Sequence, residues 1–191
     1  MEREPLRRVD VGVRLDRRKT FQLLAIAAVA FAYGTIVLGG TVRGMGAGLA
    51  CPDWPLCNGS VVPDLADPTI AVEYAHRLVA ALTSLFVLLT MILALLWHRS
   101  EMRIVTLSTI TFAVLAAQVA FGALTITSAL DWVVVTIHLA LGTATLAFAL
   151  MVALLALRIP TGAAREADAE GPSSLDEEMH HADTDEADGD P

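Results

Sequence analysis

The chain has 191 residues, of which 55% are hydrophobic and 18% charged, and its mean hydropathy is +0.59. This composition excludes an ordinary soluble domain and a chain disordered throughout. The net charge of −8 is unevenly placed, because residues 159–191 hold 11 acidic side chains and one basic one, which leaves residues 1–158 at +2. We therefore expect a small membrane protein with a separate acidic tail and no nucleic-acid partner.

Four apolar segments are long enough to cross a bilayer, which takes about 20 helical residues. They cover residues 21–40, 72–97, 104–127 and 132–157. The connections from the second span to the third and from the third to the fourth are short, so these consecutive helices are predicted to pack as antiparallel neighbours. The predicted fold is an all-α integral membrane protein, a four-transmembrane-helix bundle spanning residues 21–158, with one long loop between the first two helices.

The basic residues predict the orientation of these spans. Residues 1–20, 98–103 and 158–165 hold 11 of the 13 Lys and Arg residues, and an even number of spans places all three segments on one side. The positive-inside rule makes that side cytoplasmic. We expect a multi-pass protein of the cell membrane with both termini cytoplasmic and the first loop extracytoplasmic.

The two ends of the chain differ in character. Residues 1–20 form a basic segment. The apolar span that follows a basic segment can be a signal peptide or a retained helix. This span is long and lacks a small-residue cleavage site, which favours a retained helix. We interpret it as retained. Residues 159–191 hold almost no large apolar side chain and are predicted to be disordered. Their acidity indicates either a halophilic prokaryotic source or a generic solvated tail.

Two histidines lie within spans, where ionisable residues are costly and are functional candidates. At about 1.5 Å per residue, His138 lies roughly 9 Å below Trp132, and His76 lies about 7 Å below a helix start near Ala71. Each is followed at i+4 and i+7 by a very small residue and a threonine. This pattern favours a flat haem between facing helices, with tightly packed core histidines and another metal or proton relay as alternatives.

Glu73 precedes His76 by three residues and Arg77 by four, so the three share one helical face. One interpretation is an ion pair between Glu73 and Arg77 at the membrane boundary. The other places Arg77 and Arg43 against carboxylates of a bound cofactor and makes Glu73 a proton-transfer group. Spacing along the sequence does not separate them.

The long loop contains Cys51 and Cys57, with prolines between them that favour a turn. A disulfide is the leading interpretation for an extracytoplasmic loop. Thiol-disulfide exchange and zinc binding are the alternatives, and the loop has no second Cys or His pair for zinc.

A faint internal repeat accompanies the histidines. Residues 38–40 (LGG) and 121–123 (FGA) each precede a turn and a helix that carries one histidine. The chain is therefore interpreted as two related helical hairpins.

Three motifs together resemble the haem A synthase family. Residues 39–43 (GGTVR) and 46–55 (GAGLACPDWP) look like its first-loop signature, and residues 73–77 (EYAHR) look like its Glu-x-x-His-Arg motif. His138 looks like the histidine of its fourth helix. The resemblance covers about residues 20–158.

The resemblance implies a membrane oxidoreductase that converts haem O to haem A, by oxidising a porphyrin methyl group to formyl, for terminal haem-copper oxidases. It implies that His76 and His138 are axial ligands of haem iron, that Glu73 is the catalytic acid, and that Cys51 and Cys57 are the loop cysteines. Contacts of Arg43 and Arg77 with haem propionates are our own inference from their side of the membrane.

The length of the chain departs from the family pattern. Family members commonly have eight spans in two similar halves, one for the substrate haem and one for a haem b cofactor, whereas this chain has one half. We therefore expect a homodimer or higher homo-oligomer, with haem O synthase and the terminal oxidase as further candidate partners.

Two other functions compete with this one. A haem-carrying electron-transfer or haem-handling subunit would account for the histidines but leaves Glu73 and the loop without a role. A structural subunit with merely packed histidines accounts for neither.

Overall fold

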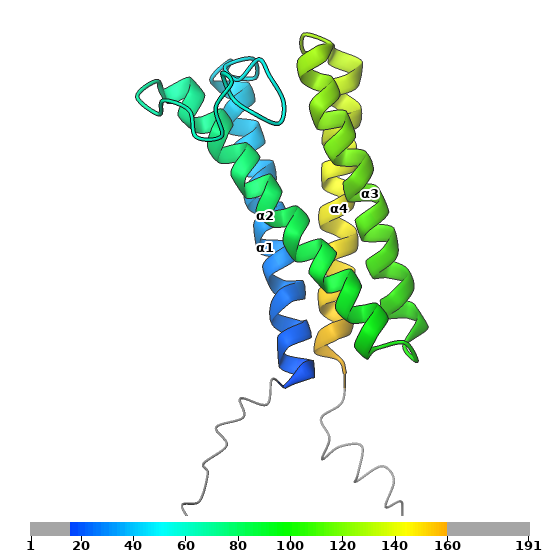
Figure 1. Ribbon diagram of the computed structural model, residues 1–191. Helices are drawn as coiled ribbons and strands as arrows, with labels where there is room; N and C mark the ends of the chain where they lie inside the picture. The colour runs from blue at the N-terminus through cyan, green and yellow to red at the C-terminus, as the bar shows by residue number, and fades with distance from the viewer. Residues whose placement is uncertain (1–15, 160–191) are drawn as a thin grey trace, which may run out of the picture. The chain divides into compact units, whose positions relative to one another are not determined.

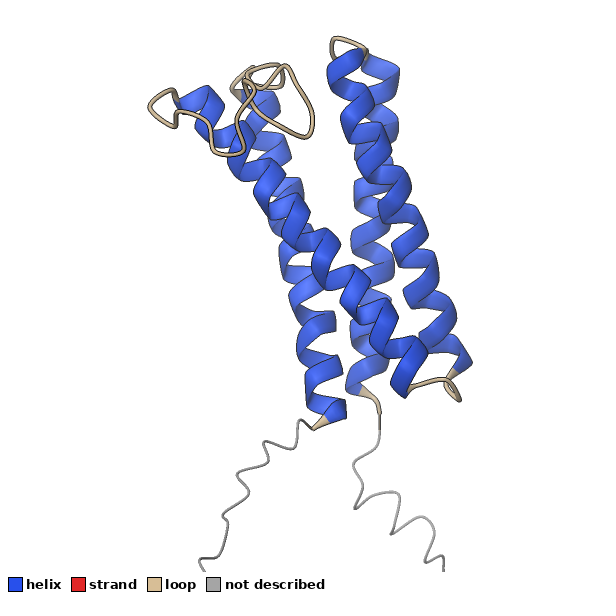
Figure 2. Cartoon of the chain, viewed as in Figure 1, coloured by secondary structure: helices blue, strands red, loops and turns tan. Residues whose placement is uncertain are grey.

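The computed structural model describes residues 16–159 and contains four helices (Figures 1 and 2). They are α1 (Arg17–Gly44), α2 (Pro68–Trp97), α3 (Met102–Thr127) and α4 (Trp132–Leu157). Each is long and apolar enough to span a membrane, and this part of the chain has no strand. The prediction of an all-α fold with four helices able to span a membrane is thus confirmed for these residues, and their predicted orientation stays a prediction. Residues 1–15 and 160–191, for which a basic segment and a disordered tail were predicted, lie outside the described residues.

Helices α1 and α2 begin four residues earlier than hydropathy predicts, and α3 begins two residues earlier. The Asp16 carboxylate accepts hydrogen bonds from the first N–H groups of α1 and caps it at Arg17. Asp67 caps α2 in the same way, and Pro68 follows at the first helical position. Capping satisfies backbone donors outside the apolar segment, so a helix extends beyond the residues that face lipid.

The four helices form a ring in which α1 contacts α2 and α4, and α3 contacts α2 and α4. Small side chains dominate the buried positions, which allows close approach of helices in a membrane. Phe86 and Phe112 pack against the core cluster of Ala28, Val87 and Leu115.

Four of the buried positions in each helix repeat between the two halves of the ring. In α1 they are Phe21, Ala25, Ala28 and Ala32, and in α3, with the same spacing, Ile104, Ser108, Thr111 and Leu115. In α2 they are Thr83, Val87, Thr90 and Ala94, and in α4 Thr145, Ala149, Val152 and Ala156. The chain is therefore built from two equivalent hairpins, α1–α2 and α3–α4, which confirms the repeat predicted from sequence.

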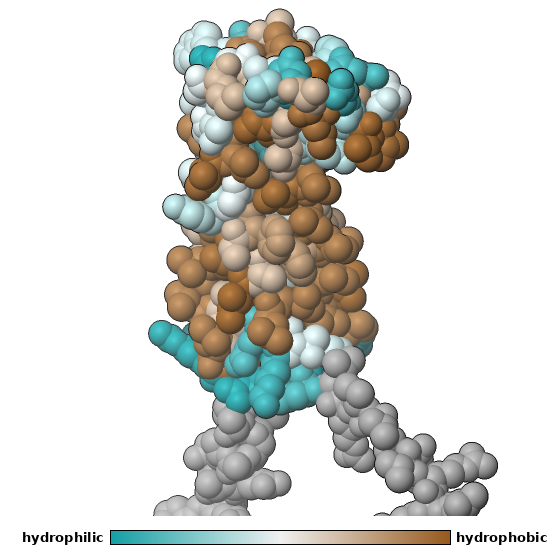
Figure 3. Space-filling model, turned by 90° about the vertical axis from the view of Figure 1, so that its left-hand side faces the viewer, coloured by the Kyte–Doolittle hydropathy of each residue, from teal (hydrophilic) through white to brown (hydrophobic). Residues whose placement is uncertain are grey.

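The core lies at one end of this ring. In the part of the chain described here, α3 has no buried residue after Leu115 and α4 has none before Gly142. Figure 1 shows the α1–α2 pair and the α3–α4 pair diverging toward the end that carries the long loop. On the face shown in Figure 3 an apolar band covers the bundle, with more polar surface beyond it at both ends.

Candidate functional site

His76 is held by two residues of α1. Its Nδ1 lies 3.1 Å from the main-chain oxygen of Thr35. A Cβ atom on Gly39, one turn further along α1, would lie only 3.1 Å from Cε1 of the ring. The absence of a side chain at Gly39 therefore lets the imidazole lie directly against α1.

His138 has the same environment in the second hairpin. Its Nδ1 lies 3.1 Å from the main-chain oxygen of Gln118, and a Cβ on Gly122 would lie 3.0 Å from its Cε1. The glycine again follows the hydrogen-bonding residue by one turn. The two histidines are thus equivalent positions of the internal repeat.

These hydrogen bonds fix the chemistry of both rings. A carbonyl oxygen only accepts, so Nδ1 carries the hydrogen and Nε2 keeps its lone pair. Histidines that ligate metals are commonly oriented in this way by a second hydrogen bond. Both rings are half-buried and lie on the part of the helices where the two hairpins diverge.

The donor set fits a haem. Among residues 16–159 no group of three or more His, Cys, Asp or Glu side chains is placed to hold a bare metal ion. A haem would need only axial ligands from the protein, and the imidazoles of His76 and His138 are of the kind that could serve. The residues one turn beyond the histidines, Ala80 and Gly142, are small, and the Gln118 amide lies against Gly142, where an added Cβ would be 3.0 Å from its Nε2.

Gln118 makes the two histidine environments unequal. Its amide Nε2 lies 3.5 Å from His138 Nε2, and its Oε1 is buried without a hydrogen-bond partner. The equivalent residue of the first hairpin is Thr35, whose hydroxyl is paired with that of Thr83 at 2.9 Å. Sequence reasoning missed both residues, although Gln118 is the only amide side chain in its span.

Glu73 and Arg77 form a buried ion pair one turn apart on α2. The Arg77 Nε donates to Glu73 Oε1 at 2.9 Å, and the two side chains are 14% and 8% exposed. The ion pair predicted as one of two interpretations is therefore present. Glu73 lies within the same turn of α2 as His76.

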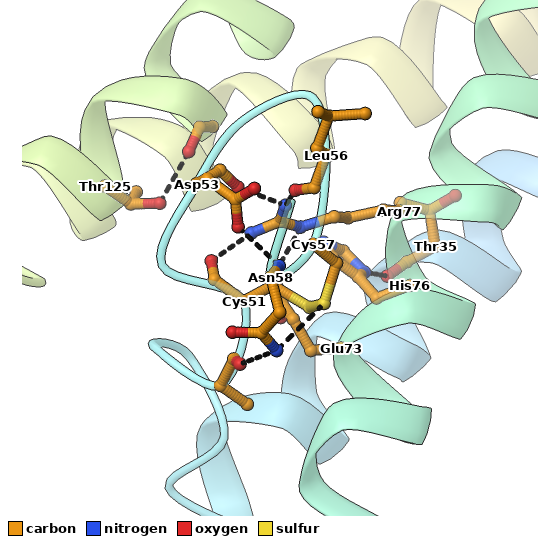
Figure 4. A network of polar contacts seen from close by, with 12 residues as sticks. Thr35, Cys51, Asp53, Leu56, Cys57, Asn58, Glu73, His76, Arg77 and Thr125 are labelled. Carbon is orange, nitrogen blue, oxygen red and sulfur yellow. Dashed lines mark hydrogen bonds and ion pairs between the residues drawn. A yellow bond between two sulfur atoms is a disulfide. The ribbon is translucent and has the colours of Figure 1, made fainter. Parts of the chain in front are cut away.

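The remaining hydrogen bonds of Arg77 go to the long loop (Figure 4). Nη1 donates to the carbonyls of Asp53 and Leu56, and Nη2 to that of Cys51, each at 2.7 Å. Four of the five N–H groups of a guanidinium are thus bonded within the chain. Contact of Arg77 with a haem propionate stays a prediction. Only one N–H of the guanidinium remains to donate such a hydrogen bond.

The long loop, residues 45–67, is cross-linked and closely folded. Cys51 and Cys57 form the predicted disulfide and are both buried. The Asp53 carboxylate accepts from the backbone N–H of Asn58 at 2.6 Å and of Gly59 at 2.8 Å. The hydrogen bond from Gly59, supported by that from Asn58, holds the pKa of the Asp53 carboxyl below its ordinary value.

The tip of the loop is a tight hairpin. Cys57 and Ser60 exchange backbone hydrogen bonds, and both intervening residues, Asn58 and Gly59, have positive φ. Asn-Gly is the sequence that such a two-residue turn prefers. The hairpin and the disulfide together orient the loop carbonyls that Arg77 binds.

The loop also reaches the second hairpin. A Cβ on Gly48 would lie 3.1 Å from a methyl carbon of Leu130 in the α3–α4 turn. Leu130 adopts a left-handed conformation with φ of 63°, which is unfavourable for a branched side chain. The loop therefore touches both hairpins at the end where they diverge.

Arg43, the other predicted cofactor contact, lies exposed in the last turn of α1. Within residues 16–159 its side chain has no ion-pair partner. Its role toward a cofactor stays a prediction.

A family model described as cytochrome oxidase assembly protein (COX15-CtaA) matches residues 22–71 and 66–176 of the chain. The chain belongs to this family. The match includes the loop, both histidines and the Glu73–Arg77 pair, so the residues assembled in the structure are those of a family domain. It also confirms the resemblance to haem A synthases derived from the sequence motifs.

Individual relatives carry two different names. The chain is 42% identical over 95 residues to a protein named Heme A synthase from Symbiobacterium thermophilum, a match that covers 49% of this chain and 30% of the relative. It is 36% identical over 113 residues to Protoheme IX farnesyltransferase 1 from Natronomonas pharaonis, covering 59% of this chain and 24% of the relative. A Protoheme IX farnesyltransferase from Halobacterium salinarum is 36% identical over 118 residues, covering 60% of this chain and 25% of the relative. The chain thus corresponds to only part of each relative.

Proposed function

We propose that this chain is a membrane haem-binding unit that takes part in forming haem A, by oxidising a methyl group of haem O to a formyl group. The observation that carries this proposal is the pair of equivalent histidines. Each has Nδ1 hydrogen-bonded to a main-chain carbonyl, a glycine against its ring and an unprotonated Nε2, which in His138 lies 3.5 Å from the Gln118 amide. The family match and the relatives named Heme A synthase support the same assignment.

In this proposal His76 and His138 are the axial ligands, and the carbonyls of Thr35 and Gln118 keep their rings in the ligating tautomer. A bound haem supplies the redox-active iron and, as haem O, the methyl group to be oxidised. His76 and His138 would hold and orient a bound haem in the half of the bundle near the long loop, where α3 and α4 have no buried residue between Leu115 and Gly142.

Glu73 is the proposed catalytic acid. It is the only buried carboxylate among residues 16–159, and it lies one turn from His76 on the same helix. Arg77 holds Glu73 Oε1, which leaves Oε2 to exchange a proton with the substrate. Conversion of a methyl group to a formyl group would require proton transfers as well as removal of electrons by the bound iron and its electron acceptor, and Glu73 is the buried carboxylate that could carry those protons.

The partners and location are part of the proposal. We propose that two copies associate so that identical bundles provide sites for haem O and for a haem b cofactor. A haem O synthase and a terminal haem-copper oxidase are the proposed supplier and recipient. The chain would lie in the cell membrane with the loop on the extracytoplasmic side.

Coexpression with a haem O synthase in a host that lacks haem A tests the proposal. We expect haem A in the extracted haems of the wild type and its loss in Glu73→Ala. Glu101→Ala, which removes an exposed carboxylate at the start of α3, is the matched control and should retain haem A. A wild type that binds haem yet yields no haem A would exclude methyl oxidation by this chain.

The relatives named Protoheme IX farnesyltransferase favour a second candidate function. A four-helix unit shared by proteins named for two different haem reactions has haem binding as its common property. In that case the chain is a haem-handling subunit, and the coexpression experiment should return bound haem b or haem O without haem A. A colourless protein would leave only a structural role.

A further inference from the structure

We infer that Asp53 is a positioning residue for Glu73, acting through the folded loop and Arg77. This inference deepens the proposed function, since it concerns how the proposed catalytic acid is held. Asp53 lies in the loop and does not touch the histidines, and it was not among the residues singled out from sequence.

The first link joins the carboxylate of Asp53 to the loop hairpin. Its two oxygens accept from different backbone N–H groups, Oδ1 from Asn58 at 2.6 Å and Oδ2 from Gly59 at 2.8 Å. Charged acceptors make stronger hydrogen bonds than neutral ones. The Asp53 carboxylate therefore links residue 53 to residues 58 and 59 and closes the segment 53–59 into a ring. This segment includes Cys57, one of the two disulfide cysteines.

The second link joins this ring to Arg77. The main-chain oxygen of Asp53 itself accepts from Nη1, and the carbonyls of Leu56 and Cys51 accept from Nη1 and Nη2. Three carbonyls from a short segment converge on one guanidinium only if that segment is tightly folded. We call the carbonyls of Cys51, Asp53 and Leu56 the carbonyl cradle.

The third link joins Arg77 to Glu73. A free arginine side chain on a helix samples several rotamers, and the cradle removes most of them by fixing both Nη atoms. Nε then points at Glu73 Oε1, at 2.9 Å. Figure 4 shows the sequence of contacts from Asp53 through Arg77 to Glu73.

Chemical labelling of Glu73 tests this inference without measuring activity. The purified protein is treated with a hydrophobic carbodiimide, and modification of Glu73 is followed by mass spectrometry. We expect Asp53→Ala to raise the labelling rate about tenfold, the factor that corresponds to loss of one charge-assisted hydrogen bond. Asp53→Asn, which keeps one acceptor oxygen, should fall between Asp53→Ala and the wild type.

Asp64→Ala is the matched control. Asp64 lies in the same loop and its carboxylate also accepts a backbone N–H, that of Ala66 at 3.0 Å, but it has no hydrogen bond to the cradle or to Arg77. Labelling of Glu73 should therefore stay at the wild-type rate. Equal rates in Asp53→Ala and Asp64→Ala would overturn the inference.

A double-mutant cycle distinguishes positioning through Arg77 from general loosening of the loop. In an Arg77→Gln background, Asp53→Ala should change the labelling rate less than about twofold, since the intermediate link is already lost. An undiminished effect in that background would also overturn the inference. If Asp53→Ala does not accumulate, Asp53→Asn is compared with Asp64→Asn in the same way.

The same variants keep this inference separate from the proposed function. Haem A formation is measured in parallel, and we expect it to fall in Asp53→Ala while the absorption spectrum of bound haem is retained. If the wild type makes no haem A but the labelling pattern appears as expected, the proposed reaction fails and the positioning role of Asp53 stands.

Discussion

The two glycines beside the histidines provide the sharpest test of the site. An alanine at Gly39 would place its Cβ 3.1 Å from His76 Cε1, and an alanine at Gly122 would place it 3.0 Å from His138 Cε1. Carbon atoms are most stable about 3.5–4.0 Å apart, so each ring would have to withdraw by roughly half an ångström.

Movement of each ring away from its glycine would stretch the hydrogen bond of Nδ1, which is already long. The bonds from Nδ1 to the carbonyls of Thr35 and Gln118 are both 3.1 Å, close to the upper limit of about 3.2 Å for an N–H donor. Loss of such a bond costs about 0.5–1.5 kcal/mol, and 1.4 kcal/mol is a factor of ten in affinity. We expect either alanine to weaken haem binding up to about tenfold.

The helix itself should not suffer from these substitutions. Alanine is favoured over glycine inside a helix by about 1 kcal/mol, which offsets part of the steric cost. The expected result is therefore a haem-binding defect in a protein that accumulates and melts normally. This combination separates damage to the site from unfolding.

Titration of the purified apoprotein with haem, followed by absorption spectroscopy, measures the effect. Gly40→Ala is the control on the same helix, because its Cβ would meet nothing within 4 Å, and it should bind haem as the wild type does. If Gly39→Ala and Gly122→Ala also bind haem like Gly40→Ala, the rings do not depend on close approach and the reasoning is refuted.

Three further predictions address other parts of the structure. Gln118→Leu removes the amide that competes for His138 Nε2, so haem affinity should rise about threefold; a weaker affinity would mean that the amide supports the bound ligand instead. Hydrogen bonds from the Thr69 hydroxyl and N–H lower the pKa of Asp67 in the folded protein. The ionised Asp67 carboxylate therefore stabilises the fold at pH values above its unfolded pKa of about 3.9, and this stabilisation is lost as the pH falls through its lower folded pKa. Asp67→Asn should therefore lose less thermal stability than wild type on acidification, and identical pH dependence of melting would contradict this. Among the described residues, the buried Ser108 hydroxyl has no hydrogen-bond partner and lies beside a cavity of about 10 Å³. Ser108→Ala removes this unpaired group, so the melting temperature should stay the same or rise. A clear fall would indicate that the hydroxyl binds a water molecule in the cavity.

Much of the fold followed from hydropathy alone. Backbone groups in lipid must be paired within a segment, so four long apolar runs predict four helices with little ambiguity. The helix starts were less well predicted, because Asp16 and Asp67 begin their helices through capping rather than through apolar side chains. Capping depends on a few hydrogen bonds that an apolar window does not detect.

The composition of the site could also be predicted in part. His76, His138 and Glu73 stand out because ionisable residues are costly in a membrane, and the structure places each of them on the half of the bundle nearest the loop. The partners Thr35 and Gln118 could not be found this way. They act mainly through main-chain oxygens, which every residue has, so their side-chain identity gives no signal.

By itself, the sequence determined that the chain has four helices long and apolar enough to span a membrane, and it singled out the ionisable residues His76, His138 and Glu73, because both follow from the cost of placing polar groups in lipid. Only the tertiary structure decided how those residues are used. It turned Arg77 toward loop carbonyls from Cys51 to Leu56, and it made the two histidines equivalent through glycines on other helices. The physical reason is that such contacts join segments distant in sequence, where spacing no longer fixes distance.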